Sequence, residues 1–274
     1  MLPEDVHNEF LENTQCRFIK AQRLYDETSK EVKITDFSND LVNKIKNVSL
    51  EAAKISQVLD SSFPTRLFSN LTDDTIQTSS EAIADRLYGL ELRKRNYIKY
   101  NLIESDDMFG SLGYLNEKIS INSRDILDLY INDALDKLAP YEPLYEKIDL
   151  FFNLINAKDF AFKKLGVSKV KGFFFMDENK VEIPLSELSS GEQNQVNLYY
   201  NMIFGINKSS IILIDEPEIS LHVGWQKEFI ESIEKIQKIN KVANVIIATH
   251  SPQIINNRWD DAYFDLFEMS VKGI

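Results

Sequence analysis

Twelve residues, Ile211-Ile-Leu-Ile-Asp-Glu-Pro-Glu-Ile-Ser-Leu-His222, decide the fold of this chain. Their first four form a continuous apolar run, which is typical of a strand buried on both faces of a parallel sheet. A second run of this kind, Val245-Ile-Ile-Ala248, lies downstream, and helix-like sequence precedes each run. We therefore expect an α/β fold with parallel strands and helices in this part of the chain.

Two acidic residues, Asp215 and Glu216, directly follow the first of these strands. The carboxyl end of a parallel strand is where α/β sheets bind their ligands. At a nucleotide site the first carboxylate can hold Mg²⁺ through water, and the second can orient and deprotonate an attacking water. Four apolar residues followed by Asp-Glu also make the Walker B pattern of nucleotide hydrolases.

Two further segments carry candidate chemistry. Leu188-Ser-Ser-Gly-Glu-Gln193 opens a helix in which small residues let backbone N–H groups approach an anion, with Ser189 and Ser190 as hydroxyl donors. The alternative is an ordinary serine cap with Glu192 in the first turn. After the second strand, His250 can hydrogen-bond a γ-phosphate or the attacking water, or it can simply cap the strand end.

In chain order, these three segments resemble the signature, Walker B and H-loop motifs of ABC-type ATPases. The wording of residues 215–222, followed by Trp225-Gln226 and by Ala248-Thr-His-Ser-Pro-Gln253, is similar to the soluble, non-transporter branch. That branch comprises OLD-family and related defence-system ATPases of AAA type, with SMC and double-strand-break-repair ATPases as more distant kin. The resemblance covers about residues 160–267, and it implies part of a P-loop ATPase head joined to a helical insertion.

The resemblance also implies roles for individual residues. Asp215 would position Mg²⁺, Glu216 would be the catalytic base and His250 would sense the γ-phosphate of ATP. The segment with Glu218, Ser220 and His222 would be the D-loop at a homodimer interface. The signature-like loop would contact a nucleotide held by the opposite subunit through Ser189, Ser190, Gly191 and Glu192, although Ser190 stands where family signatures commonly have a first glycine.

A phosphate-binding loop, Gly-x-x-x-x-Gly-Lys-Ser/Thr, begins at none of the nine glycines. We therefore expect the chain to start after the Walker A lobe, either as a fragment, as a natural truncation with a separate partner, or as a binding module without turnover. A strand is expected near residues 16–21, which resembles the strand that precedes a helical insertion in relatives; the resemblance implies that Gln22 contacts Mg²⁺ as a Q-loop glutamine, and the alternative is an ordinary surface residue. The chain alone is expected to bind ATP weakly and to hydrolyse it negligibly.

The middle of the chain is predicted to form a helical arm or bundle. Apolar residues recur at steps of three and four from Leu41 to Leu59, with Ser38 or Asn39 as the cap and Pro64 as the end of this region. Further helices are expected at about residues 74–103, 123–138 and after Pro143. The expected domains are thus 1–35 (end of the N-terminal lobe), 36–165 (arm) and 166–274 (C-terminal lobe, with a hairpin at 172–183 and a last strand at 262–267).

Composition limits the function. The 274 residues contain 31 Lys+Arg and 43 Asp+Glu, a net charge of −12 that disfavours a general nucleic-acid-binding surface. One basic cluster with interleaved tyrosines remains as a candidate DNA contact or a solvated helix face: Arg86, Arg93, Lys94, Arg95 and Lys99. One cysteine and three histidines exclude a disulfide framework and a Cys- or His-rich metal centre.

The sequence also gives expectations for the localisation and the partners of the protein. The sequence has neither a signal peptide nor an apolar run long enough for a membrane helix, so a cytoplasmic protein is expected. The leading function is an ATPase half that couples ATP binding and hydrolysis to dimer opening and closing, in phage defence or a DNA-related process, with a nuclease or toxin as a separate effector. The competing function is an inactive helical scaffold for such a partner.

Overall fold

The computed structural model describes residues 16–20, 34–71, 79–104, 121–158, 160–206, 211–242 and 244–256. They form two units. Unit 1 draws on residues up to Ile34, on Asn153–Phe162 and on the chain from Leu185 onward, and unit 2 consists of Thr35–Phe152 and Lys163–Pro184. The domains expected at 1–35, 36–165 and 166–274 stay a prediction.

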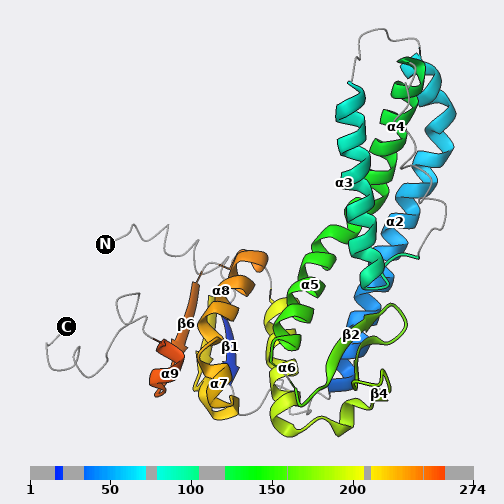
Figure 1. Ribbon diagram of the computed structural model, residues 1–274. Coiled ribbons are helices and arrows are strands. Elements are labelled where there is room, and N and C mark those ends of the chain that lie inside the picture. The colour runs from blue at the N-terminus through cyan, green and yellow to red at the C-terminus, as the bar shows by residue number, and fades with distance from the viewer. Residues whose placement is uncertain are drawn as a thin grey trace, which may run out of the picture. The chain divides into compact units, whose positions relative to one another are not determined.

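Unit 1 contains a parallel sheet. Its described strands are β1 (Cys16–Lys20), β5 (Ile211–Asp215) and β6 (Asn244–Ala248), in the order β1-β5-β6 (Figure 1). Both pairings are parallel, so the parallel strands and the early strand predicted from sequence are confirmed. The register aligns Lys20, Asp215 and Ala248, which brings the carboxyl ends of all three strands to one edge.

Of the two strands predicted from apolar runs, β5 is the more deeply buried. Ile212 and Ile214 of β5 are buried, whereas Ile246 of β6 is 59% exposed. The expectation of a second fully buried strand is therefore wrong for β6, which lies at the edge of the described strand order.

Helices accompany the sheet in unit 1. They are α6 (Ser190–Phe204), α7 (Val223–Gln226), α8 (Phe229–Asn240) and α9 (Pro252–Ile255), with single turns η3 (Leu185–Glu187) and η4 (Pro217–Ser220). The α8 helix buries Phe229, Ile233 and Ile236. At its end the Asn240 side-chain amide donates to the Met202 carbonyl of α6 over 2.7 Å, which joins the two helices.

Unit 2 is mainly helical. Its helices α2 (Ile34–Leu71), α3 (Ser80–Lys99) and α4 (Ile121–Leu138) run side by side (Figure 1), and η2 (Ala139–Tyr141) leads into α5 (Glu142–Asn156). The α3 and α4 helices are parallel and share a core of Ile83, Leu87 and Ile131. The predicted helices are thus confirmed, and no helix among the described residues is long and apolar enough to cross a membrane.

The first of these helices is longer than the sequence suggested. Pro64 lies inside α2 instead of ending it. A proline removes the backbone donor of the Asp60 carbonyl and crowds the preceding turn, and side chains form hydrogen bonds with other carbonyls of that turn. The Ser62 hydroxyl lies 2.9 Å from the Val58 carbonyl, and the Arg66 guanidinium donates to the Leu59 carbonyl over 2.8 Å.

Three antiparallel strands complete unit 2: β2 (Lys164–Ser168), β3 (Gly172–Met176) and β4 (Glu182–Ile183). The β3–β4 hairpin confirms the prediction, and its turn is closed by Asp177, whose carboxylate accepts from the Val181 N–H over 2.8 Å. Ser38 is not a helix cap, since α2 begins at Ile34. Its hydroxyl instead contacts the strands, lying 2.6 Å from the Lys171 carbonyl and accepting from the Phe173 N–H over 3.2 Å.

Candidate functional site

The acid pair and the histidine lie at the same edge of the sheet. Asp215 is the last residue of β5 and pairs in register with Ala248, the last residue of β6, so Glu216 and His250 leave neighbouring strand ends. The Glu216 N–H donates to the Ala248 carbonyl over 2.8 Å. The His250 Nε2 atom is 3.6 Å from the Glu216 Oε1 atom. Parallel pairing therefore brings together two groups that are far apart in sequence.

Glu216 holds an unusual backbone conformation. Its φ of 45° and ψ of 55° lie in the left-handed region, which a residue with a Cβ enters at a cost of about 1–2 kcal/mol. The conformation turns the chain sharply from β5 into η4, whose first residue is the buried Pro217. Backbone strain at a strand end beside an acid pair is the pattern of a functional site.

The Asp215 carboxylate is half-buried and has no hydrogen bond or ion pair within the described part of the chain. No group of three or more His, Cys, Asp or Glu side chains among the described residues is arranged to hold a metal. Mg²⁺ is commonly held by one or two carboxylates together with waters and substrate phosphates. An uncommitted Asp215 therefore fits a metal that arrives with a nucleotide.

The D-loop-like segment is tied to the loop after β6. The Glu218 carboxylate accepts from the Thr249 hydroxyl over 2.8 Å and from the His250 N–H over 2.7 Å. The Ser251 hydroxyl donates to the Gln226 amide oxygen over 2.6 Å in a buried contact. The segment that follows the acid pair thus supports the loop that carries the histidine.

His222 is the cap of α7, since its Nδ1 accepts from the Gly224 N–H over 3.3 Å. Its ring is 5.9 Å from that of Trp225, whose indole N–H donates to the Lys158 carbonyl over 3.0 Å. The Lys158 side chain is only 1% exposed, and its ammonium forms an ion pair with Glu228 at 3.0 Å. These contacts hold His222, the last residue of the D-loop-like segment, in place within unit 1.

The signature-like loop forms a helix cap. The Ser189 hydroxyl accepts from the Glu192 N–H over 3.3 Å, and the Glu192 carboxylate accepts from the Ser189 N–H over 2.7 Å. This capping box is the structural alternative weighed from sequence. Ser190 is exposed, and a Cβ added to Gly191 would meet nothing within 4 Å. The chain's own packing therefore gives no reason for a glycine at position 191.

The basic cluster is engaged within unit 2. Arg86 pairs with Asp128 of α4, Arg93 lies 3.5 Å from Glu142, and Arg95 lies 3.7 Å from Glu91. Lys99 lies 3.5 Å from Asp149 and 4.6 Å from the centre of the Tyr100 ring. Lys94 is likewise not without a partner. Because acidic partners balance these charges, the arrangement favours the solvated helix face over a phosphate-binding surface.

Two of the tyrosines next to this cluster, Tyr97 and Tyr100, are structural. The Tyr97 and Tyr100 hydroxyls donate to the carboxylates of Glu142 and Asp149. Burial, aided by these hydrogen bonds, raises the pKa of both tyrosines well above the usual value near 10. They join α3 to α5 and are not free to stack on bases.

Some predicted residues lie outside the described part of the chain. They are Gln22 and the strand at 262–267, and the side chain of Ser220 is also undescribed. Conversely, sequence reasoning assigned no role to Thr249, Ser251 or Gln226, which form the contacts around His250. The sequence does contain one signal for Thr249 and Ser251, namely a Ser or Thr on each side of a strand-end histidine, but it contains none for Gln226.

Comparison with known proteins identifies the family of the chain. A search of curated proteins found no match to the chain. The family described as "AAA domain, putative AbiEii toxin, Type IV TA system" matches residues 5–256, which include both strand ends and the signature-like loop. An AAA-type ATPase-like domain is thus shown for most of the sequence, and the chain belongs to this AAA domain family.

Proposed function

We propose that this chain supplies the Walker B acid pair, the histidine and the signature-like helix of an OLD-like ABC-type ATPase. The observation that carries the proposal is the β5–β6 register: Glu216 and His250 lie side by side, 3.6 Å apart, next to an Asp215 carboxylate that has no partner among the described residues. In α/β folds, nucleotides and other ligands usually bind at the carboxyl ends of the strands, which is where this acid pair lies.

Each residue has a separate task. Asp215 holds Mg²⁺, which when bound neutralises charge on the phosphates. Glu216 orients and deprotonates the attacking water, and its left-handed backbone directs it away from the strand axis. His250, whose side chain is 90% exposed, is free to donate to a γ-phosphate at this edge.

The remaining parts of the site come from other polypeptide. The sequence has no Gly-x-x-x-x-Gly-Lys-Ser/Thr run, so the phosphate-binding lysine is supplied by another chain or by another part of a longer protein. A second copy presents its α6 N-terminus to the nucleotide. The open space at Gly191 supports this, because a glycine there allows close approach of a ligand from outside the chain.

Hydrolysis would open and close the dimer and so act on an effector. The description of the family, "putative AbiEii toxin, Type IV TA system", supports a role in a toxin–antitoxin or defence system, and within that role we assign the effector to a toxin or nuclease.

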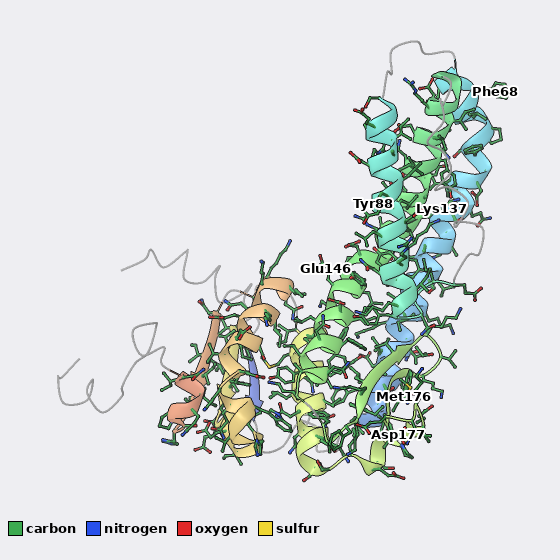
Figure 2. The ribbon with its side chains drawn as sticks, in the orientation of Figure 1. Phe68, Tyr88, Lys137, Glu146, Met176 and Asp177 are labelled. Carbon is green, nitrogen blue, oxygen red and sulfur yellow. The ribbon has the colours of Figure 1, made fainter. Side chains whose placement is uncertain are left out.

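The test compares two preparations: the chain purified alone and the chain purified from its own cells with the proteins that accompany it. Phosphate release from MgATP is measured for wild type and Glu216→Gln. We expect negligible turnover alone and turnover in the native assembly that Glu216→Gln lowers by roughly 10²–10⁴-fold, as for loss of a general base. Glu146→Gln, an exposed residue of α5 in unit 2 (Figure 2), is the matched control and should leave turnover unchanged.

Turnover that survives Glu216→Gln would refute the assignment of the acid pair. Turnover by the isolated chain that Glu216→Gln abolishes would retain the acid pair but refute an external phosphate-binding loop.

The second candidate function is an interaction scaffold without turnover. It is favoured by exposed apolar side chains on the helices of unit 2: Phe68 is 71% exposed and Tyr88 is 68% exposed, and both point outward (Figure 2). A native assembly that lacks ATP turnover but loses its partner on Phe68→Ser or Tyr88→Ser would support the scaffold over the ATPase.

A further inference from the structure

The loop that carries His250 has little packing of its own to hold it. His250 is exposed, with its side chain 90% accessible, and Thr249 is only partly buried. Only Ser251 in this loop is buried. A short exposed loop of this kind needs hydrogen bonds from a neighbouring element to hold one conformation.

Glu218 provides these hydrogen bonds. One carboxylate oxygen lies 2.7 Å from the His250 backbone nitrogen and the other lies 2.8 Å from the Thr249 hydroxyl. The Thr249 oxygen in turn accepts from the Ser251 N–H over 3.0 Å. One carboxylate therefore orders three successive residues, and hydrogen bonds to an ionised acceptor are about twice as strong as neutral ones.

Glu218 is itself held in place. It follows the buried Pro217, and the Leu221 N–H donates to its carbonyl over 3.1 Å. The Gln226 side-chain amide donates to the Leu221 carbonyl over 3.0 Å, while its oxygen accepts from Ser251. The same segment thus contacts the His250 loop twice, through Glu218 and through Gln226.

We propose that Glu218 is a positioning residue, which fixes residues 249–251 so that the His250 imidazole faces Glu216. The catalytic meaning of this geometry rests on the proposed function. The hydrogen bonds themselves do not. A movement of the D-loop-like segment would be passed through Glu218 to His250, so the two loops respond together to whatever contacts the segment.

The test measures the His250 backbone amide directly. Hydrogen exchange is followed by NMR on the ¹⁵N-labelled full chain, because an exposed N–H is protected only if it is hydrogen-bonded. We expect Glu218→Ala to speed exchange at His250 by roughly 10- to 100-fold, the range for loss of one hydrogen bond to a charged group. Glu187→Ala, an exposed residue without a described hydrogen bond in the same unit, should change nothing.

The conservative variant separates positioning from general destabilisation. In Glu218→Gln the amide oxygen can still accept from His250, but the NH₂ group now faces the Thr249 hydroxyl, so protection should be partly restored. The ring signals of His250 should shift at constant pH in Glu218→Ala, while those of His222, which packs on Trp225, should not. Unchanged exchange at His250, or equal changes at both histidines, would overturn the proposal.

Turnover of the native assembly provides the second readout. Glu218→Ala and His250→Ala should each lower kcat, and the double variant should be no worse than His250→Ala alone, because Glu218 acts through His250. An additive double variant would overturn the positioning role. If exchange at His250 behaves as expected but Glu216→Gln leaves turnover intact, then the ATPase assignment fails while the role of Glu218 in ordering the loop stands.

Discussion

The contact between Ser38 and the β2–β3 strands gives a sharp prediction for the stability of unit 2. Ser38 is 4% exposed, and its hydroxyl lies 2.6 Å from the Lys171 carbonyl, 2.8 Å from the Phe173 carbonyl and 3.2 Å from the Phe173 nitrogen. A hydroxyl has one hydrogen, so it donates to one carbonyl at a time while it accepts from Phe173. Ser38→Ala removes both bonds.

The cost is the sum of two effects. Loss of the donated bond costs about 1 kcal/mol, and loss of the bond from the Phe173 N–H at this buried position costs about 1–3 kcal/mol more. We therefore expect Ser38→Ala to lower the free energy of unfolding by about 2–4 kcal/mol. Ser61→Ala on the same helix is the matched control: Ser61 is exposed and bonds only to the Val58 carbonyl, so a change within about 0.5 kcal/mol is expected.

The assay is urea unfolding followed by far-UV circular dichroism, which reports mainly the helices of unit 2. Trp225 lies in unit 1, so its fluorescence, recorded in a Trp259→Phe background, serves as an internal reference for that unit. A fall in the midpoint with an unchanged denaturant slope would indicate a change in stability alone. The reasoning is refuted if Ser38→Ala and Ser61→Ala unfold at the same urea concentration.

Two other predictions follow from the described contacts. Burial raises the pKa of Tyr97, so its contribution to stability is complete below the unfolded-state pKa near 10 and is lost as pH rises above it; Tyr97→Phe should therefore flatten the loss of helical signal between about pH 10 and 12. A Tyr97→Phe protein that loses structure with base as steeply as wild type would contradict this. Gly191→Ala should stabilise the isolated chain by up to about 1 kcal/mol in thermal unfolding, because the added Cβ meets no atom, and should nevertheless lower turnover of the native assembly. Unchanged turnover would show that nothing approaches α6 at this point.

Local sequence patterns predicted the elements whose signals are local. The β5 strand is a continuous apolar run and α4 has a clear helical period, so both could be identified without the structure. Pro64 was misread because the donors that support α2 around it, Ser62 and Arg66, are side chains whose role depends on the folded helix. The β2 strand was missed because Gly166 interrupts its pattern, while in the structure the ring of Phe174 occupies the space a side chain would take.

In the candidate site, too, the sequence predicted the residues with a local signal and missed the contacts that depend on the folded structure. Asp215, Glu216 and His250 could be found because each follows an apolar strand, and parallel strands end at one edge. The contact from Glu218 to Thr249 spans 31 positions and depends on the turn at Glu216, whose left-handed backbone no sequence pattern requires. Contacts of this kind depend on the register of two elements and on a strained turn between them, so residue identity alone does not reveal them.

Satisfied and unsatisfied polar groups are unevenly distributed within unit 1. The loops at the sheet edge satisfy one another through Glu218, Gln226 and Ser251. On α6, in contrast, neither amide atom of the fully buried Gln195 has a hydrogen-bond partner among the described residues, and the same holds for the hydroxyl of the buried Tyr199. A change in the surroundings of α6 would give these groups new partners without breaking a hydrogen bond of their own, whereas movement of the sheet-edge loops would break bonds already made. We therefore expect nucleotide-driven change to begin in the helix that carries the signature-like loop, with the acid pair held still.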